Sequence, residues 1–258
     1  MRHSTLYTIL FATIVCVVCG VMVSGAAVSL KDQQDFNSAL DKRKKVLEAA
    51  GIAKPGEDLT AEQVEAAFAN VESAVVELET GKVVPDIDPA AYNARKAKAD
   101  PQASKPAPPN QAGLTRVADH AAIYILRGEG GDVELLVLPI EGVGLWGLMY
   151  GFLALDADLQ TVRGLTYYEH KETPGLGGEV DNPSWKARWP GRKVFEDGEV
   201  ALSVIKGPAP PPAAAPYQVD GLSGATFTAR GVTNMLQFWL SDTGFGPFLE
   251  RFRAGEIS

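Results

Sequence analysis

One stretch of the chain reads Asp220-Gly-Leu-Ser-Gly-Ala-Thr226, and it continues at once as Phe227-Thr-Ala-Arg-Gly-Val-Thr-Asn-Met-Leu-Gln-Phe-Trp-Leu240. After Thr226 the apolar residues recur at the three-and-four spacing of one helical face, which predicts an amphipathic helix. The apolar positions of that face are Val232, Met235, Leu236, Trp239 and Leu240. Thr226 is therefore expected near a helix N-terminus, where unpaired backbone N–H groups and the positive end of the macrodipole favour a phosphate or another anion.

The loop before this helix is suited to a close ligand. Gly221 and Gly224 allow a tight backbone turn and a close approach to a ligand, because they carry no Cβ. The Thr226 hydroxyl would lie beside a phosphate held at the helix start, which is the arrangement that a phosphoester bond to the protein needs. The alternative is an ordinary loop whose hydroxyl caps the helix. Taken alone, Ser223-Gly-Ala-Thr226 favours that simpler interpretation.

Length and composition limit the class of protein. The chain has 258 residues, of which 46% are hydrophobic, so it can form one large domain or two small ones with a real core. Its net charge is −8, and no basic tract covers a face of the predicted domain. These properties argue against a nucleic-acid partner.

The N-terminal segment from Leu6 to Leu30 contains no charged residue. As a helix it would be about 37 Å long, which is enough to cross a hydrocarbon core of about 30 Å. A cleaved signal peptide is the alternative, since Ser24-Gly-Ala-Ala27 offers small residues at a plausible cleavage point. Its apolar core would however be unusually long for a signal peptide. We expect a retained, single-pass anchor in contact with membrane lipid.

The orientation of this span is predicted by the distribution of basic residues. Arg2 precedes the span, whereas Lys31 and the cluster 42–45 follow it. Because basic residues favour the cytoplasmic side, the count places the C-terminal domain in the cytoplasm.

Residues 31–112 are predicted to form a helical neck and a linker. A charged helix is expected from Asp35 to Ala50, and a capping box at Thr60-Ala-Glu-Gln63 opens a second helix. The apolar face of that second helix comprises Val64, Ala67, Phe68, Val71 and Val75. The segment 85–111 is rich in Pro, Ala and Lys and is expected to be extended.

Residues 113–258 are predicted to form a mainly antiparallel sheet with flanking helices, an α+β domain. The β-like runs 123–126 and 133–138 flank a glycine-rich turn, and the runs 149–155 and 162–168 form a second such pair. A further strand is expected at 201–206, before a proline-rich insert. With the anchor at 1–30, the chain has three predicted parts.

Two other stretches could bind a ligand. Gly142-Val-Gly-Leu-Trp-Gly147 offers close backbone approach and the flat ring of Trp146, although a buried aromatic residue at a turn is an equally good interpretation. Glu169-His-Lys-Glu-Thr-Pro-Gly-Leu-Gly-Gly178 has no Rossmann glycine spacing and suits the edge and face of a flat heterocycle, with Leu176 on the face. His170 in this stretch suggests acid–base chemistry, but an exposed charge cluster is the simpler interpretation.

The stretch Asp220–Thr226 resembles the flavinylation motif Asp-x-x-Ser/Thr-Gly-Ala-Thr/Ser at every defined position. From about Leu145 onward the sequence resembles the C subunit of the sodium-translocating NADH:quinone oxidoreductase, a family of FMN-binding domains behind a single span. The likeness is carried by Leu145-Trp146, Leu165-Thr-Tyr-Tyr-Glu169, Glu172-Thr-Pro-Gly-Leu-Gly-Gly-Glu179, Asn182-Pro183, Trp185, Asp220–Thr226, Phe238-Trp239-Leu240 and Gly244-Phe-Gly-Pro-Phe-Leu249.

This resemblance implies a role for individual residues. Thr226 would carry FMN through a phosphoester, and Asp220 would belong to what the flavin transferase recognises. The residues lining the phosphate would be Ser223, Gly224 and Ala225. The flavin contacts would be Trp146, Glu172, Thr173, Leu176 and Gly177. Lys206 could offset charge on the flavin or its phosphate, with a solvated lysine at a strand end as the alternative.

The resemblance also implies a function without acid–base catalysis or a bound metal. FMN on this protein would pass single electrons from an iron–sulfur centre in the membrane subunits to a second flavin, on the way to quinone, while the complex exports sodium. The FMN domain would lie on the periplasmic side of a bacterial inner membrane, which is opposite to the orientation that the count of basic residues predicts. Two alternatives stay open: the flavoprotein of the ferredoxin:NAD oxidoreductase complex, and a membrane-anchored module that binds an anion without a covalent bond.

Overall fold

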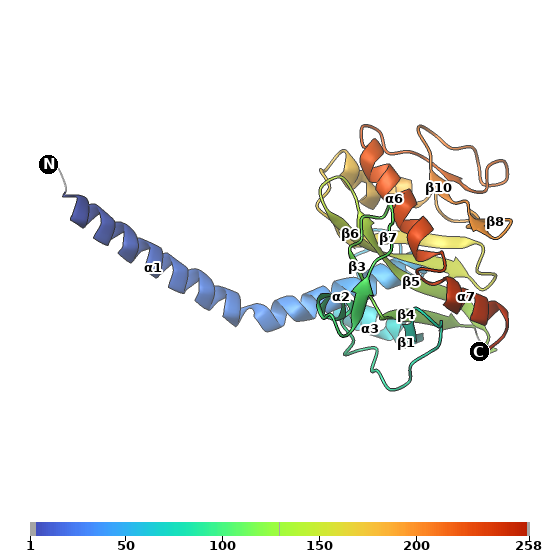
Figure 1. The fold of residues 1–258 in the computed structure, drawn as a ribbon, viewed down its shortest axis with the longest axis horizontal. Coiled ribbons are helices and arrows are strands. Elements are labelled where there is room, and N and C mark those ends of the chain that lie inside the picture. Colours follow the sequence, from blue (N-terminus) through green and yellow to red (C-terminus); the bar gives the residue numbers. More distant parts are fainter. Residues whose placement is uncertain (1–3, 129, 257–258) are drawn as a thin grey trace. The chain divides into compact units, whose positions relative to one another are not determined.

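The computed structural model describes residues 4–128 and 130–256, which form two compact units, Met1–Lys42 and Arg43–Ser258 (Figure 1). Arg2, which the orientation count used, and Glu129 of the predicted turn lie outside the described residues. The first unit holds helix α1, Thr5–Ser29, which starts at the N-cap Ser4 and has no buried residue. It is the one described helix that is long and apolar enough to cross a membrane. Helix α2, Lys31–Ala49, begins in this unit and ends in the second.

The second unit is built on a five-stranded antiparallel sheet in the order β1-β4-β5-β6-β7. The strands are β1 Val71–Glu77, β4 His120–Arg127, β5 Val133–Val143, β6 Leu148–Asp156 and β7 Val162–Glu169. The two predicted hairpins, β4 with β5 and β6 with β7, are confirmed. The predicted α+β class is confirmed with them.

Successive side chains along the central strands point to opposite faces of the sheet, and both faces carry apolar residues. On β5, Leu136 and Leu138 belong to the larger core, whereas Leu135 and Val137 belong to a smaller one. Both faces are covered, which is why the central strands are apolar at successive positions and not at alternate positions only.

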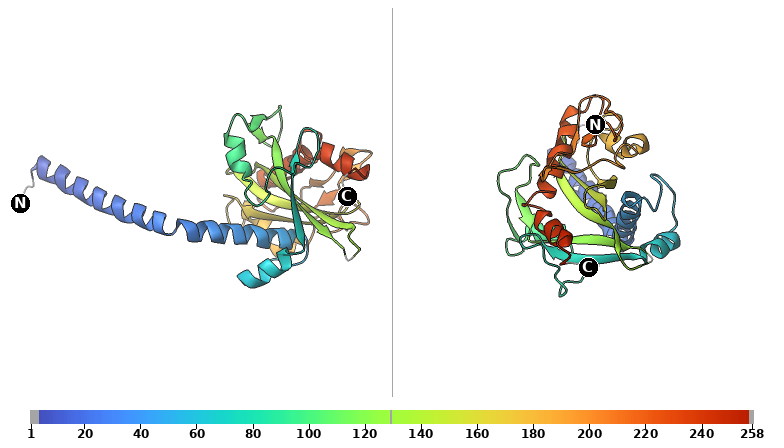
Figure 2. Two further views of the ribbon diagram at one scale, coloured as in Figure 1. Left: turned by 90° about the horizontal axis from the view of Figure 1, so that it is seen from below. Right: turned by 90° about the vertical axis from the view of Figure 1, so that its right-hand side faces the viewer.

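Helices cover each face of the sheet (Figure 2). The larger core includes residues of α6, Thr226–Trp239, and α7, Gly246–Arg253. The smaller core includes Val46 and Ala49 from the end of α2, and Phe68 of α3, Ala61–Phe68, packs against it. The minor elements are α4 Ala94–Ala99, β2 Ser104–Pro106, β3 Arg116–Ala118, η1 Gly177–Asp181, α5 Pro183–Lys186, β8 Phe195–Glu196, β9 Glu199–Val200, β10 Ser203–Val204 and β11 Gln218–Val219.

The predicted second helix starts as expected but ends early. Thr60 and Gln63 form the capping box, and the helix stops at Phe68. The prediction that it continues through Val71 and Val75 is wrong, because Val71–Glu77 is strand β1 and pairs with β4 along its whole length. The valines of this segment suit a half-buried edge strand, and pairing with β4 outweighs the weak helical period.

Two other predictions about local structure need correction. The segment 85–111 is not simply extended, because it contains α4 and strand β2, which pairs with β3. The strand predicted at 201–206 is limited to Ser203–Val204, and it pairs in parallel with β11, which lies after the proline-rich insert. These short elements depend on distant partners, which local sequence does not specify.

Candidate functional site

The predicted helix after the Ser-Gly-Ala-Thr loop is confirmed, and its first residue is Thr226. Its N-cap is Ala225, which supplies no side-chain hydrogen bond to the first turn. The alternative in which a loop hydroxyl caps the helix is therefore wrong. The first turn keeps its backbone N–H groups free of a side-chain cap, so it can receive an anion.

Glycines bring the neighbouring loops close to this helix start. A Cβ on Gly221 would lie 2.3 Å from the carbonyl oxygen of Ile205, so only glycine allows the two backbones to meet there. Gly224 has φ +70°, and its ideal Cβ position is 3.0 Å from a methyl group of Leu176. The turn before Thr226 is thus held between the 205–207 loop and the loop that carries Leu176.

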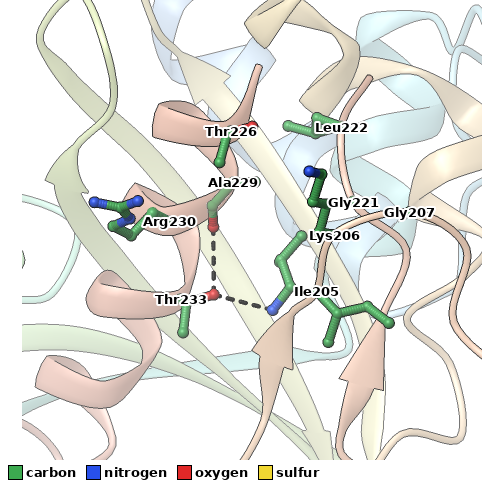
Figure 3. A pocket seen from close by; sticks show the side chains of 10 residues that line it. Ile205, Lys206, Gly207, Gly221, Leu222, Thr226, Ala229, Arg230 and Thr233 are labelled. Carbon is green, nitrogen blue, oxygen red and sulfur yellow. Dashed lines mark hydrogen bonds between the residues drawn. The ribbon is translucent and has the colours of Figure 1, made fainter. Parts of the chain in front are cut away.

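A cavity of about 220 Å³ opens beside Thr226 (Figure 3). Its walls are one face of α6, the end of β10 with the residues that follow it, and the start of the Gly221 loop. The lining residues are Val204, Ile205, Lys206, Gly207, Gly221, Leu222, Thr226, Ala229, Arg230 and Thr233. Thr233 ties two walls together, because its hydroxyl accepts the Val204 N–H at 2.9 Å and donates to the Ala229 carbonyl at 3.3 Å.

Two cationic side chains line this cavity. Lys206 and Arg230 are exposed, and neither forms an ion pair with a described carboxylate. The Arg230 guanidinium lies 5.6 Å from the centre of the Phe227 ring, within the range of a cation–π contact. Together with the helix start, these charges make the cavity suitable for a phosphate group.

Arg230 was not among the residues predicted from the sequence. The available signal was its position four residues after Thr226, which places both side chains on one face of the helix. Lys206 was predicted and does line the cavity. Ser223, Gly224 and Ala225 precede Thr226 in the turn and are not among the lining residues.

The other predicted contacts lie in loops near the helix start. Trp146 and Leu176 are exposed, with 64% and 45% of their surface accessible, which is unusual for large apolar side chains. The alternative of a buried Trp146 is therefore wrong. The Trp146 indole N–H donates to the Thr173 hydroxyl at 3.1 Å, so the two loops are joined. An exposed indole and an exposed leucine are suited to the face of a flat ring.

Glu172 differs from its neighbours because it is buried, with 5% of its surface exposed. Its Oε1 accepts the backbone N–H groups of Leu145 and Trp146, at 3.0 and 2.9 Å. Its Oε2 accepts the Thr228 hydroxyl of α6. Gly177 is also buried and packs against this carboxylate.

His170 belongs to a partly buried network and not to an exposed charge cluster. Its Nε2 lies 2.7 Å from Asp181, and the buried Lys186 lies 3.4 Å from Asp181 and 2.9 Å from Glu48. Burial by itself would raise the pKa of Asp181, but the hydrogen bond with His170 and the charge of Lys186 outweigh it and lower the pKa. This network holds the two ends of the 170–181 loop together.

Asp220 has a clear structural role in the turn. Its Oδ1 accepts the Ala209 N–H at 3.1 Å, and its carbonyl oxygen accepts the indole N–H of Trp185 at 2.8 Å. The side chain therefore fixes the start of the Gly221 loop against the proline-rich insert.

Comparisons with known proteins agree with this arrangement. Residues 144–241 match the FMN-binding domain family. The sequence is 46% identical to the C subunit of the Na(+)-translocating NADH-quinone reductase of Yersinia pestis, over 97% of this chain and 94% of the relative. It is 44% identical to the corresponding protein of Pseudomonas aeruginosa, over 99% and 98%.

Solved structures show the same fold. The crystal structure of Shewanella oneidensis NqrC superposes with a TM-score of 0.76 at 32% identity, covering 83% of this chain and 98% of that chain. The crystal structure of the Parabacteroides distasonis relative, which carries the same reductase name, gives a TM-score of 0.65 at 26% identity, covering 85% and 96%. The fold described above therefore has solved counterparts.

Proposed function

The protein belongs to the NqrC family, the C subunits of the Na(+)-translocating NADH-quinone reductase, and from that premise we propose that it carries single electrons through an FMN joined to Thr226 by a phosphoester. As a member of this family it is a flavoprotein and a part of an ion-translocating oxidoreductase, so the other subunits are its partners. The observation that supports the attachment point best is the Thr226 hydroxyl at a helix start without a side-chain cap, in a cavity lined by two cationic side chains.

The residues around Thr226 fit the phosphate of FMN. The N–H groups of the first turn can donate to phosphate oxygens, and Lys206 and Arg230 can balance their negative charge. Gly221 and Gly224 allow the 205–207 loop and Leu176 to pack closely against this turn. A phosphate held in this way would lie beside the Thr226 hydroxyl, the oxygen proposed to carry the ester.

The flavin ring is proposed to lie against the two exposed loops. Trp146 and Leu176 offer apolar surface, and Thr173 keeps the indole in place through its hydroxyl. When bound, FMN supplies the one-electron chemistry, while the protein binds and orients it. No side chain needs to transfer a proton to a substrate.

The covalent bond gives the carrier a fixed location. A tethered group stays at a high effective concentration near its redox partners, whereas a free one could diffuse away. We propose that α1 anchors the protein as a single pass in a bacterial inner membrane, in contact with lipid, with the FMN domain on the periplasmic side. A flavin transferase would load Thr226 and recognise the Asp220 turn.

The attachment is tested with Thr226→Ala in the full-length protein produced together with its flavin transferase. We expect folded protein without covalent flavin, whereas wild type and Ser223→Ala gain the mass of FMN less one water, measured by intact-mass spectrometry. Flavin fluorescence that stays with the Thr226→Ala band on a denaturing gel would refute Thr226 as the acceptor.

A second measurement separates covalent from non-covalent binding. Native wild-type protein is precipitated with acid, and the colour of pellet and supernatant is compared. Covalent FMN stays in the pellet. Complete release of flavin into the supernatant would favour the alternative in which the cavity binds an anion reversibly.

A further inference from the structure

Glu172 is an unusual buried carboxylate because its partners are all hydrogen-bond donors without a full charge. Two backbone N–H groups, those of Leu145 and Trp146, and the Thr228 hydroxyl donate to it. No described Lys, Arg or His side chain forms an ion pair with it. A carboxylate is an acceptor on both oxygens, so this residue type can serve two N–H groups and a hydroxyl at once.

The three donors come from two parts of the fold that are far apart in sequence. Leu145 and Trp146 lie in the loop between β5 and β6, and Thr228 lies in the first turn of α6, two residues after Thr226. Thr228 is fully buried. Glu172 therefore joins the loop that presents the exposed indole to the helix turn that presents the proposed attachment residue.

The surrounding backbone leaves room for this carboxylate and for little else. An ideal Cβ on Gly144 would lie 2.6 Å from Oε1 of Glu172, and one on Gly177 would lie 2.4 Å from Oε2. Both distances are too short for a real Cβ. The two glycines thus enclose the carboxylate from both sides, so its position is determined by close packing as well as by hydrogen bonds.

We propose that Glu172 is a positioning residue of the flavin site, which sets the location of Trp146 relative to Thr226, and is not itself a flavin contact. Both of its oxygens are already used by the protein, and 5% of the residue is exposed. It acts through the loop backbone and through Thr228. The inference rests on the proposed function, because Trp146 matters only if a flavin lies beside it.

The first experiment needs no flavin. Amide hydrogen exchange is measured at Leu145 and Trp146 in the full-length, unflavinylated protein for wild type, Glu172→Leu and Glu172→Gln. Glu172→Leu removes the acceptor from two N–H groups, so we expect their exchange to accelerate about tenfold or more. Glu172→Gln keeps one acceptor oxygen, and we expect it to restore much of the protection.

A second pair of variants tests the link to α6. Thr228→Val removes the donated hydrogen bond at similar volume, whereas Thr228→Ser keeps it. In the flavinylated protein we expect Glu172→Leu and Thr228→Val to lengthen the flavin fluorescence lifetime, because a displaced Trp146 quenches the flavin less. Thr228→Ser is expected to keep the wild-type lifetime.

The matched control is Glu169→Leu, which removes an exposed carboxylate from the same segment, one that pairs with Arg95. It should leave both the exchange and the lifetime unchanged. Wild-type exchange at Leu145 and Trp146 in Glu172→Leu, or equal effects in Glu169→Leu, would overturn the proposal. If Glu172→Leu fails to fold, an unchanged lifetime in Thr228→Val overturns it instead.

The two proposals fail in different ways. If the wild-type protein carries no covalent flavin, the proposed function fails while the exchange result still reports on Glu172. If the wild type is flavinylated and its lifetime is insensitive to both variants, the positioning role fails and the proposed function stands.

Discussion

Single residues at the site divide into those that present a group to a ligand and those that hold the presenting loops in place. Thr226, Lys206 and Arg230 line one cavity and contribute a hydroxyl and two cationic groups to its lining. The carboxylates of Asp220 and Glu172 accept hydrogen bonds from backbone N–H groups of neighbouring loops. Removing a residue of the first kind should change ligand binding, whereas removing one of the second kind should change the loops.

Gly177 gives a prediction at this scale. The Cβ of an alanine there would meet the Glu172 carboxylate and the Thr228 hydroxyl, at 2.4 and 2.6 Å. We expect Gly177→Ala to destabilise the protein by about 1–3 kcal/mol, as overpacking of a buried site does. Urea unfolding of the fragment 43–258 measures this.

The control for this prediction is Gly128→Ala, whose Cβ would have a nearest neighbour at 3.9 Å. Its free energy of unfolding should stay within about 0.5 kcal/mol of wild type, as is usual for surface substitutions. Equal unfolding midpoints for both variants would contradict the packing argument.

At the scale of elements, the turn between β6 and β7 shows how one side chain can organise a hairpin. Asp158 Oδ1 accepts the N–H groups of Gln160 and Thr161, at 2.9 and 2.7 Å, and Oδ2 accepts the Thr161 hydroxyl at 2.5 Å. Burial raises the pKa of Asp158, but these hydrogen bonds and the charge of Lys193 outweigh it and lower the pKa to about 2.

This lowered pKa predicts a pH dependence of stability. Because the folded-state pKa lies below the ordinary aspartate value of about 4, the stabilisation is complete above pH 4 and is lost as the pH falls toward 2. We expect Asp158→Asn to lower the melting temperature at pH 7, and the difference from wild type to shrink between pH 4 and pH 2.

Thermal unfolding followed by circular dichroism at several pH values measures this effect. The control is Glu196→Gln, at the last residue of β8, whose exposed side chain makes no described hydrogen bond. If the melting temperature of Asp158→Asn differs from that of wild type by the same amount from pH 7 to pH 2, the carboxylate charge is not the cause of the stabilisation.

Strand β1 is a second example at the scale of elements. Its segment shows an apolar three-and-four pattern continuous with α3, yet it pairs with β4 from Val71 to Glu77. Periodicity over a few residues cannot separate helix from strand, and here the partner strand lies about fifty positions later in the sequence.

At the scale of the whole molecule, the sheet begins before the domain boundary predicted from the sequence. Residues 43–112 contribute β1 to the sheet, and the end of α2 with α3 covers its smaller core. The predicted division at residue 113 separates these parts from the rest, and truncation tests it directly.

We expect a fragment of residues 43–258 to fold as a soluble domain with a single cooperative urea transition. A fragment of 113–258 should be poorly soluble, because it exposes the edge of β4 and the apolar face that Val46, Ala49 and Phe68 cover. Solubility, far-UV circular dichroism and urea unfolding of both fragments measure this. A stable, cooperative 113–258 fragment would support the predicted boundary instead.

The sequence by itself determined the long apolar N-terminal helix, the two central hairpins and the helix that begins at Thr226. Each of these depends on contacts between near neighbours along the polypeptide: an uncharged run, a turn between two apolar segments, an amphipathic period after two glycines. Only the tertiary structure decided that Val71–Glu77 is a strand, that Arg230 and Lys206 share a cavity, and that Glu172 is buried between the Trp146 loop and Thr228. Those features depend on pairing and packing between segments that are far apart in the sequence. A local sequence pattern carries no information about the energy of such contacts.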